Sequence, residues 1–321
     1  MKILLSLFII SLTLAGFVFA QQNIKELQKI SGSYLGQKPP KKIAEPFAVD
    51  YLNTRFRSFH GGIIFSPDGK EAYWQGMRND GTRILGIWES KIKDGYWTEP
   101  KIAPFSIYTT DFIDDSPFMS PGGDKIFFLS NRPVEKNGKS DKWNIWFVNR
   151  EKEGWSDPLL LSPIINPSYN LHWRFSLDGN GNLYFGSQNE GDPPTGDIYL
   201  SKYENGKYTK PEKLGTEINR AGVYNYSPFI AKDGSYLLFN RFPDITFCSF
   251  RKKDGSWTEA KSISDITGPE KDNPIVTPDG KYLFLRGFNK NNKQWTLYWM
   301  DASFIEELRK KELKDDNKLY P

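Results

Sequence analysis

Nine side chains able to bind or react occupy matching points of a repeated pattern, just before one apolar segment or just after the next. They are His60, Asp114, Asp115, Arg132, His172, Tyr226, Arg241, Asp272 and Arg286. A guanidinium binds a carboxylate or phosphate through two parallel hydrogen bonds. Paired carboxylates can supply the acid and the base of glycoside hydrolysis. These residue types predict a site for a polar or anionic ligand.

Two other interpretations of the same residues stay open. The polar groups could satisfy one another and the ends of the strands that carry them, as exposed turns often do. The two histidines could bind a metal if Asp114, Asp115 or Asp272 supplied oxygen ligands. Two histidines are few for such a centre, so we predict no metal and no cofactor.

A four-residue turn that occurs five times marks the elements that would position these side chains. Its copies are Ser66-Pro67-Asp68-Gly69, Ser120-Pro121-Gly122-Gly123, Ser176-Leu177-Asp178-Gly179, Ala231-Lys232-Asp233-Gly234 and Thr277-Pro278-Asp279-Gly280. Proline presets φ for a turn, and glycine supplies the positive φ that reverses the chain. An apolar, aromatic strand follows each copy. About every 50 residues the pattern offers four strand-like pieces, which is the signature of a β-propeller blade.

The fifth repeat ends without a fourth strand, and a segment near the N-terminus matches the missing piece. Pro40 to Phe47 resembles Pro100 to Phe105, which completes the first repeat. Closing the ring in this way leaves no exposed sheet edge. We therefore predict an all-β chain with one propeller of five four-stranded blades, closed by an N-terminal strand, with six blades as the alternative. A short helix is predicted to start at Ser303, which has Glu306 at the capping-box spacing.

In a propeller, the loops entering the inner strands and leaving the second strands meet around one mouth of the central channel. The nine side chains would therefore form one polar ring on a rigid scaffold, where loops often carry function. By contrast, Trp97, Trp155 and Trp257 stand at a fixed point beside the outer strand. We expect these three to pack the blades.

The repeats resemble the Pro-Asp-Gly repeats of TolB-type propellers, which are relatives of WD-repeat proteins, in the short form of exported bacterial proteins. The likeness rests on Ser66 to Lys70, on Ser120 to Lys125 with Ser130-Asn131-Arg132, and on Thr277 to Lys281. It implies the fold across nearly the whole chain. A sialidase Asp box needs one residue between Asp and Gly, whereas Gly follows Asp directly here.

The first twenty residues read as an export signal, with Lys2, an apolar run from Ile3 to Leu14, and Val18-Phe19-Ala20 before the expected cleavage point. The predicted divisions are residues 1–20 (signal peptide), 21–39 (N-terminal segment), 40–301 (propeller) and 302–321 (helix and tail). The formal net charge of +4 is too small to indicate nucleic-acid binding. The single cysteine, Cys248, cannot form an internal disulfide and is expected in the core.

These observations favour a non-catalytic binding or interaction protein over an enzyme. Its channel face would hold a glycan, a small polar ligand or an envelope protein partner. The alternative is a carbohydrate-active enzyme, a glycoside hydrolase or a lyase, with its site at the channel mouth. A scaffold without a ligand is a third reading. We expect a periplasmic or secreted monomer with no membrane span in its mature form.

Overall fold

The computed structural model describes residues 29–82, 85–107, 109, 111–135, 138, 142–166, 171–188, 196–242, 246–291 and 293–313, with the backbone alone at 171–173. The predicted export signal and the end of the predicted tail lie outside these residues.

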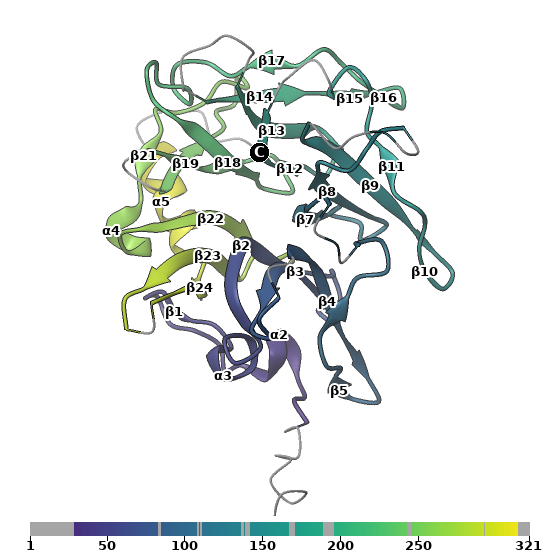
Figure 1. Ribbon diagram of the computed structural model, residues 1–321. Coiled ribbons are helices and arrows are strands. Elements are labelled where there is room, and N and C mark those ends of the chain that lie inside the picture. The colour runs from purple at the N-terminus through teal and green to yellow at the C-terminus, as the bar shows by residue number, and fades with distance from the viewer. Residues whose placement is uncertain are drawn as a thin grey trace, which may run out of the picture.

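The chain forms a five-bladed β-propeller whose blades surround a central channel (Figure 1). From the channel outward, blade 1 contains β2 (Phe56–Phe65), β3 (Glu71–Arg78), β4 (Leu85–Lys93) and β6 (Lys101–Ile102). Blade 2 contains β7 (Asp114–Met119), β8 (Lys125–Ser130), β9 (Asn144–Glu151) and β11 (Leu159–Leu160). Blade 3 contains β12 (Leu171–Leu177), β13 (Leu183–Gln188), β14 (Asp197–Ser201) and β17 (Glu212–Lys213). Blade 4 contains β18 (Asn225–Ile230), β19 (Tyr236–Arg241), β20 (Thr246–Phe250) and β21 (Lys261–Ser262).

The fifth blade is built from both ends of the described chain. Its strands are β22 (Lys271–Val276), β23 (Tyr282–Asn289), β24 (Gln294–Asp301) and, outermost, β1 (Glu45–Pro46). Glu45 pairs with Trp299 and Pro46 with Tyr298, and the Phe47 N–H donates to the Leu297 carbonyl at 2.8 Å. The predicted closure of the ring by an N-terminal strand is therefore confirmed, and the alternative of six blades is not.

Short outer hairpins extend beyond the blades, and two of them carry Trp97 and Trp155, which were predicted to pack. The hairpin strands are β5 (Tyr96–Trp97), β10 (Gly154–Trp155), β15 (Tyr203–Glu204) and β16 (Lys207–Tyr208). Trp97, Trp155 and Trp257 are all buried. Trp155 donates its indole N–H to the Tyr73 hydroxyl at 3.0 Å and stacks beneath Arg150, so it joins blade 2 to blade 1.

The second strand of each blade is buried on both faces because it lies between neighbouring blades. In β3, Tyr73 and Trp74 point to opposite faces, and each has no exposed surface. Phe127 and Phe128 repeat this arrangement in β8. The apolar runs of the sequence thus fill the spaces between blades, and Cys248 is buried among them.

Four of the five predicted turns have the expected geometry, with glycine at positive φ. These glycines are Gly69, Gly123, Gly234 and Gly280. The third turn lies two residues later than predicted: Gly181 (φ 82°), not Gly179, takes the positive φ, and the Asp178 N–H donates to the Asn182 carbonyl. The sequence there contains two Asx-Gly pairs, and the later one makes the turn.

Four short helical elements accompany the blades in the described chain: α2 (Ser33–Gly36), α3 (Val49–Leu52), α4 (Ser264–Thr267) and α5 (Phe304–Leu313). In α2, Tyr34 packs its ring edge-on against Phe65 and Tyr282, and Leu35 is fully buried. The predicted C-terminal helix is α5, whose last residue, Leu313, is buried in the core. No helix in the described part of the chain is long and apolar enough to cross a bilayer.

Candidate functional site

The innermost strands carry an irregularity at one equivalent position in every blade. The residues there are Gly62, Ser116, Arg174, Ser227 and Asn273, one from each blade, and each strand shifts register beside them. The four non-glycine residues have φ values between 50° and 55°. Left-handed backbone of this kind is strained for residues with a side chain and recurs at functional sites. All five residues line one narrow part of the channel.

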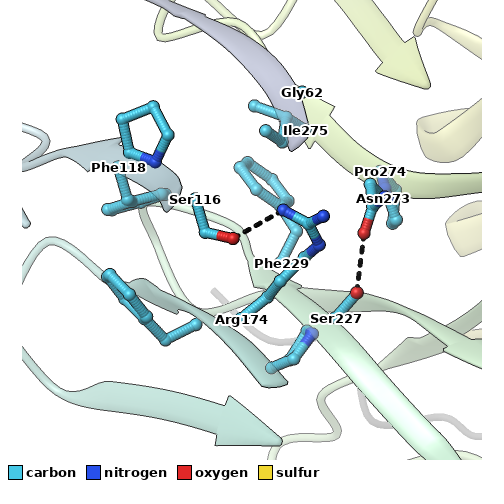
Figure 2. Close-up of a pocket in the computed structure, with 12 residues that line it drawn as sticks. Gly62, Ser116, Phe118, Arg174, Ser227, Phe229, Asn273, Pro274 and Ile275 are labelled. Atoms are coloured by element: carbon cyan, nitrogen blue, oxygen red, sulfur yellow. Dashed lines mark hydrogen bonds between the residues drawn. The ribbon is translucent and has the colours of Figure 1, made fainter. Parts of the chain in front are cut away.

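These five residues and their neighbours narrow the channel to a neck of about 30 Å³. Figure 2 shows Arg174 reaching across the neck, with Nη1 donating to the Ser116 hydroxyl at 2.6 Å. On the other side, the Ser227 hydroxyl donates to Asn273 Oδ1 at 2.8 Å. Blade 1 contributes Gly62, where an added Cβ would lie 2.5 Å from Ile275. A side chain at this position would therefore require the terminal methyl group of Ile275 to move.

One mouth of the channel opens into a cavity of about 270 Å³ beside this neck. Its chemically active lining consists of His60, Asp115, Arg174, Tyr226, Asp272 and Arg286. These side chains come from all five blades. Leu129 and Trp143 add apolar surface. Five of the nine predicted residues thus meet in one cavity: His60, Asp115, Tyr226, Asp272 and Arg286.

His60 and Asp115 form a pair between blade 1 and blade 2. Nδ1 of His60 lies 2.6 Å from Oδ2 of Asp115, and the His60 N–H donates to Gln75 Oε1 at 2.9 Å. The Asp115 carboxylate is buried, whereas the His60 side chain is 60% exposed. Burial alone would raise the pKa of Asp115, but His60, Arg174 and the Ser116 N–H hold it well below its usual range. Asp115 is therefore a carboxylate that orients the imidazole.

Arg286 and Asp272 form a second pair, within blade 5. Arg286 Nε donates to Asp272 Oδ1 at 2.8 Å, and Nη2 donates to Oδ2. Nη1 donates to the His60 carbonyl at 2.9 Å, and the guanidinium lies over the Trp295 ring. Burial and the charge of Asp272 raise the pKa of Tyr226, which lines the same cavity, to about 12.

Arg174 carries the least compensated charge in the cavity. Its terminal nitrogens donate to the Ser116 hydroxyl and to the His60 carbonyl, which are neutral partners. Burial lowers the pKa of Arg174 and the like charge of Arg286 adds to that shift, whereas the charges of Asp115 and Asp272 oppose it. A further negative charge in direct contact with Arg174 would therefore stabilise the charged guanidinium.

Three predicted residues lie elsewhere, inside their own blades. Asp114 has no exposed surface, and Arg132 Nη2 donates to its Oδ1 at 2.7 Å. Arg241 is buried as well, with Nε donating to Asn225 Oδ1 at 3.0 Å. These two guanidinium groups turn inward because buried acceptors are there to meet them. For His172, the structure gives the backbone pairing with Ser187.

Arg174 is the residue that the sequence analysis missed. It lies in the middle of an apolar inner strand, where no turn or loop signal points to it. The repeat does carry a signal: the other four blades have only Gly, Ser or Asn at that position, so a single Arg is the exception. Among the described residues, no group of three or more His, Cys, Asp and Glu side chains could hold a metal.

Comparisons with known proteins concern the fold. No family model matches the chain, and no curated protein matches it in sequence. An alpha-L-arabinofuranosidase from Lactobacillus brevis aligns at 13% identity and TM-score 0.49, covering 78% of this chain and 93% of that one. The Cps50 (Swd1) β-propeller domain of Myceliophteria thermophila aligns at 12% identity and TM-score 0.40, covering 74% of this chain and 65% of that one. A puromycin-hydrolyzing peptidase of Mycobacterium tuberculosis aligns at 14% identity and TM-score 0.42, covering 70% of this chain but only 34% of that one. The chain is a five-bladed β-propeller, and the structures that it resembles include both enzymes and a separate β-propeller domain.

Proposed function

We propose that this protein binds a small acidic ligand, of the size and chemistry of a uronic acid residue in a glycan, at the mouth of its channel. The observation that carries the proposal is the position of Arg174. Its half-buried guanidinium has only neutral hydrogen-bond partners and lies in a cavity with Arg286. A ligand carboxylate would give this guanidinium a direct ionic partner through a bidentate contact.

Hydrogen-bond geometry supports the same assignment. Each terminal nitrogen of Arg174 carries two N–H groups, and one of each is used by Ser116 or His60. The second N–H of each has no acceptor among the described residues, so a carboxylate could accept both. Arg286 is less suitable as the primary contact, because Asp272 already accepts from two of its nitrogens.

The remaining lining fits a sugar ring. Trp143 and Leu129 provide an apolar surface, and Asp272 and the Tyr226 hydroxyl provide partners for hydroxyl groups. The cavity of about 270 Å³ is at the small end of ligand pockets, so it would hold one or two sugar residues and not a long chain.

The sequence supports the cellular setting that we propose with this function. The apolar run from Ile3 to Leu14 favours a periplasmic or secreted protein. The turns at Ser66 to Lys70 and Thr277 to Lys281 favour a place among TolB-type propellers. A glycan or an envelope protein bearing acidic groups is the partner that we propose.

Calorimetry with galacturonic and glucuronic acid oligosaccharides, and with neutral oligosaccharides of the same length, tests the proposal. The wild type should bind the acidic series and not the neutral one. Arg174→Gly should weaken binding by about 1–3 kcal/mol. Glycine suits this position because it tolerates positive φ and blade 1 already has it there.

The matched control is Arg309→Ala, which removes a surface guanidinium of α5 that pairs with Glu306. It should bind like the wild type. Absence of binding to every acidic oligosaccharide, or equal affinity of Arg174→Gly and wild type, would show that the proposed function is wrong.

A further inference from the structure

His60 pairs with the buried carboxylate of Asp115 and accepts hydrogen bonds from Arg174 and Arg286. Ligand binding alone does not require this arrangement, but catalysis by a base does. Resting on the proposed function, we infer that His60 and Asp115 form a general-base dyad that cleaves uronic-acid glycans by β-elimination. His60 would remove the proton on the sugar carbon next to the carboxylate that Arg174 holds.

The first support is the way that the imidazole is fixed. Asp115 accepts from Nδ1 at 2.6 Å, so the neutral ring keeps its proton there and presents a lone pair at Nε2. The backbone of His60 is held on both sides, because its N–H donates to Gln75 and its carbonyl accepts from Arg174 and Arg286. The ring is 60% exposed and lines the cavity, so Nε2 is the nitrogen that a ligand can meet.

The second support is the position of the cations. Removing a proton next to a carboxylate places a second negative charge on that group, and catalysis requires fixed positive charges where it develops. Arg174 and Arg286 both donate to the carbonyl of the residue that carries the base. Both positively charged groups are therefore anchored by hydrogen bonds to the residue that supplies the base.

The structure also disfavours acid-catalysed hydrolysis. A glycoside hydrolase needs one carboxyl group that keeps its proton in order to protonate the leaving oxygen. Asp115 is held ionised by His60 and Arg174, and Arg286 donates twice to Asp272. Neither carboxylate of the cavity is arranged to donate a proton.

The atoms of the proposed step balance without a cofactor or a consumed water. The C5–H bond breaks and its proton goes to Nε2 of His60. The electron pair forms the C4=C5 double bond, and the C4–O4 bond breaks to release the rest of the chain. The departing oxygen takes a proton from the Tyr226 hydroxyl, and solvent then restores the protons of Tyr226 and His60.

The test follows product formation and binding separately, with trigalacturonate and triglucuronate as the probes. Ultraviolet absorbance reports the conjugated C4=C5 product, and proton NMR in deuterated water reports exchange at C5 even when no bond to oxygen breaks. We expect product from the wild type. His60→Gln can still hydrogen-bond Asp115 but has no basic nitrogen, so turnover should fall by about 10²–10⁴-fold while affinity changes only a few-fold.

A matched pair of carboxylate variants isolates the dyad. Asp115→Asn should lower turnover, whereas Asp124→Asn, in the turn after the same strand β7, should not. Thermal unfolding of each variant identifies any loss of fold, and His60→Gln then decides the question because its backbone contacts are unchanged.

The outcomes separate the two proposals. Binding of the acidic trisaccharides with neither product nor C5 exchange would overturn the base assignment and leave the binding function standing. Full turnover by His60→Gln would do the same. If the wild type binds no acidic trisaccharide, both proposals fail together.

Discussion

Arg132 lies with its Nη2 atom 2.7 Å from Oδ1 of Asp114, and the same nitrogen donates to the Phe105 carbonyl at 3.2 Å. Phe105 belongs to the segment that enters blade 2 from blade 1. Arg241 repeats the arrangement in blade 4, where it donates to Asn225 and to the Ile218 carbonyl on the segment that arrives from blade 3. Both arginines therefore fasten one blade to the next.

Arg132→Ala should destabilise the fold because it leaves the buried Asp114 carboxylate without its cation. The expected loss is about 3 kcal/mol or more in the free energy of unfolding, measured by urea titration. Arg241→Ala should cost less, about 2 kcal/mol, because Asn225 is neutral. Equal stability of Arg132→Ala and wild type would contradict the fastening role.

Phe47→Ala tests the closure of the ring. Phe47 is fully buried, with its ring centre 4.9 Å from that of Phe284 and 5.0 Å from that of Trp299. Truncation should cost about 3–5 kcal/mol in unfolding free energy. Ile43→Ala, on the same N-terminal segment but 79% exposed, is the control and should stay within about 0.5 kcal/mol of wild type.

Gly69→Ala, Gly280→Ala and Gly95→Ala should each cost about 1–2 kcal/mol. All three glycines have positive φ, and an added Cβ would meet nothing within 4 Å, so backbone strain is the whole effect. Gly95 thus belongs with the repeat turns even though it lies in an outer hairpin. Melting temperatures check this, and the Gly→Asn variants should recover part of the loss since Asn tolerates left-handed backbone.

The free energy of unfolding at acidic pH should depend on Asp115. His60, Arg174 and the Ser116 N–H face it and hold its folded pKa below the unfolded value of about 3.9. Its stabilisation is therefore complete above that value and is lost as the pH falls toward the folded pKa. The gap in unfolding free energy between wild type and Asp115→Asn should be widest near neutrality and shrink below about pH 4. The exposed Asp111→Asn should follow the wild-type curve, and a gap that persists at low pH would count against this assignment.

The repeat explains why so much of the fold was predictable. Five turns with their apolar strands determine the number of blades, and the resemblance of Pro40–Phe47 to Pro100–Phe105 identified the closing strand. The N-terminal segment was less predictable. The sequence marked residues 21–39 only as an N-terminal segment without an assigned role, and the structure shows Tyr34 and Leu35 packing on blades 1 and 5 through a left-handed turn. Domain boundaries beyond this remain predictions.

The position of the cavity at the channel mouth was predictable, but only part of its lining was. Loop entry points placed His60, Asp115, Tyr226, Asp272 and Arg286 around one channel mouth, where the cavity is found. Whether an arginine points into the channel or into its blade depends on acceptors from neighbouring blades. Arg132 donates to the Phe105 carbonyl and Arg241 donates to the Ile218 carbonyl. Neither acceptor can be identified from the sequence around the arginine. Placing Arg174 in the cavity required knowledge of the register shift in its strand, which the sequence does not show.

The closing strand also sets the order in which this protein can fold. The Glu45–Trp299 pairing joins residues from opposite ends of the described chain, so it is among the most non-local contacts in the molecule. Contacts of this kind form late, because a long loop must be ordered before they contribute. During synthesis, the segment around Glu45 emerges early and has no partner until β24 follows. Blades 1 to 4 can form from local hairpins. The ring becomes a single cooperative unit only when β1 pairs with β24 in the fifth blade.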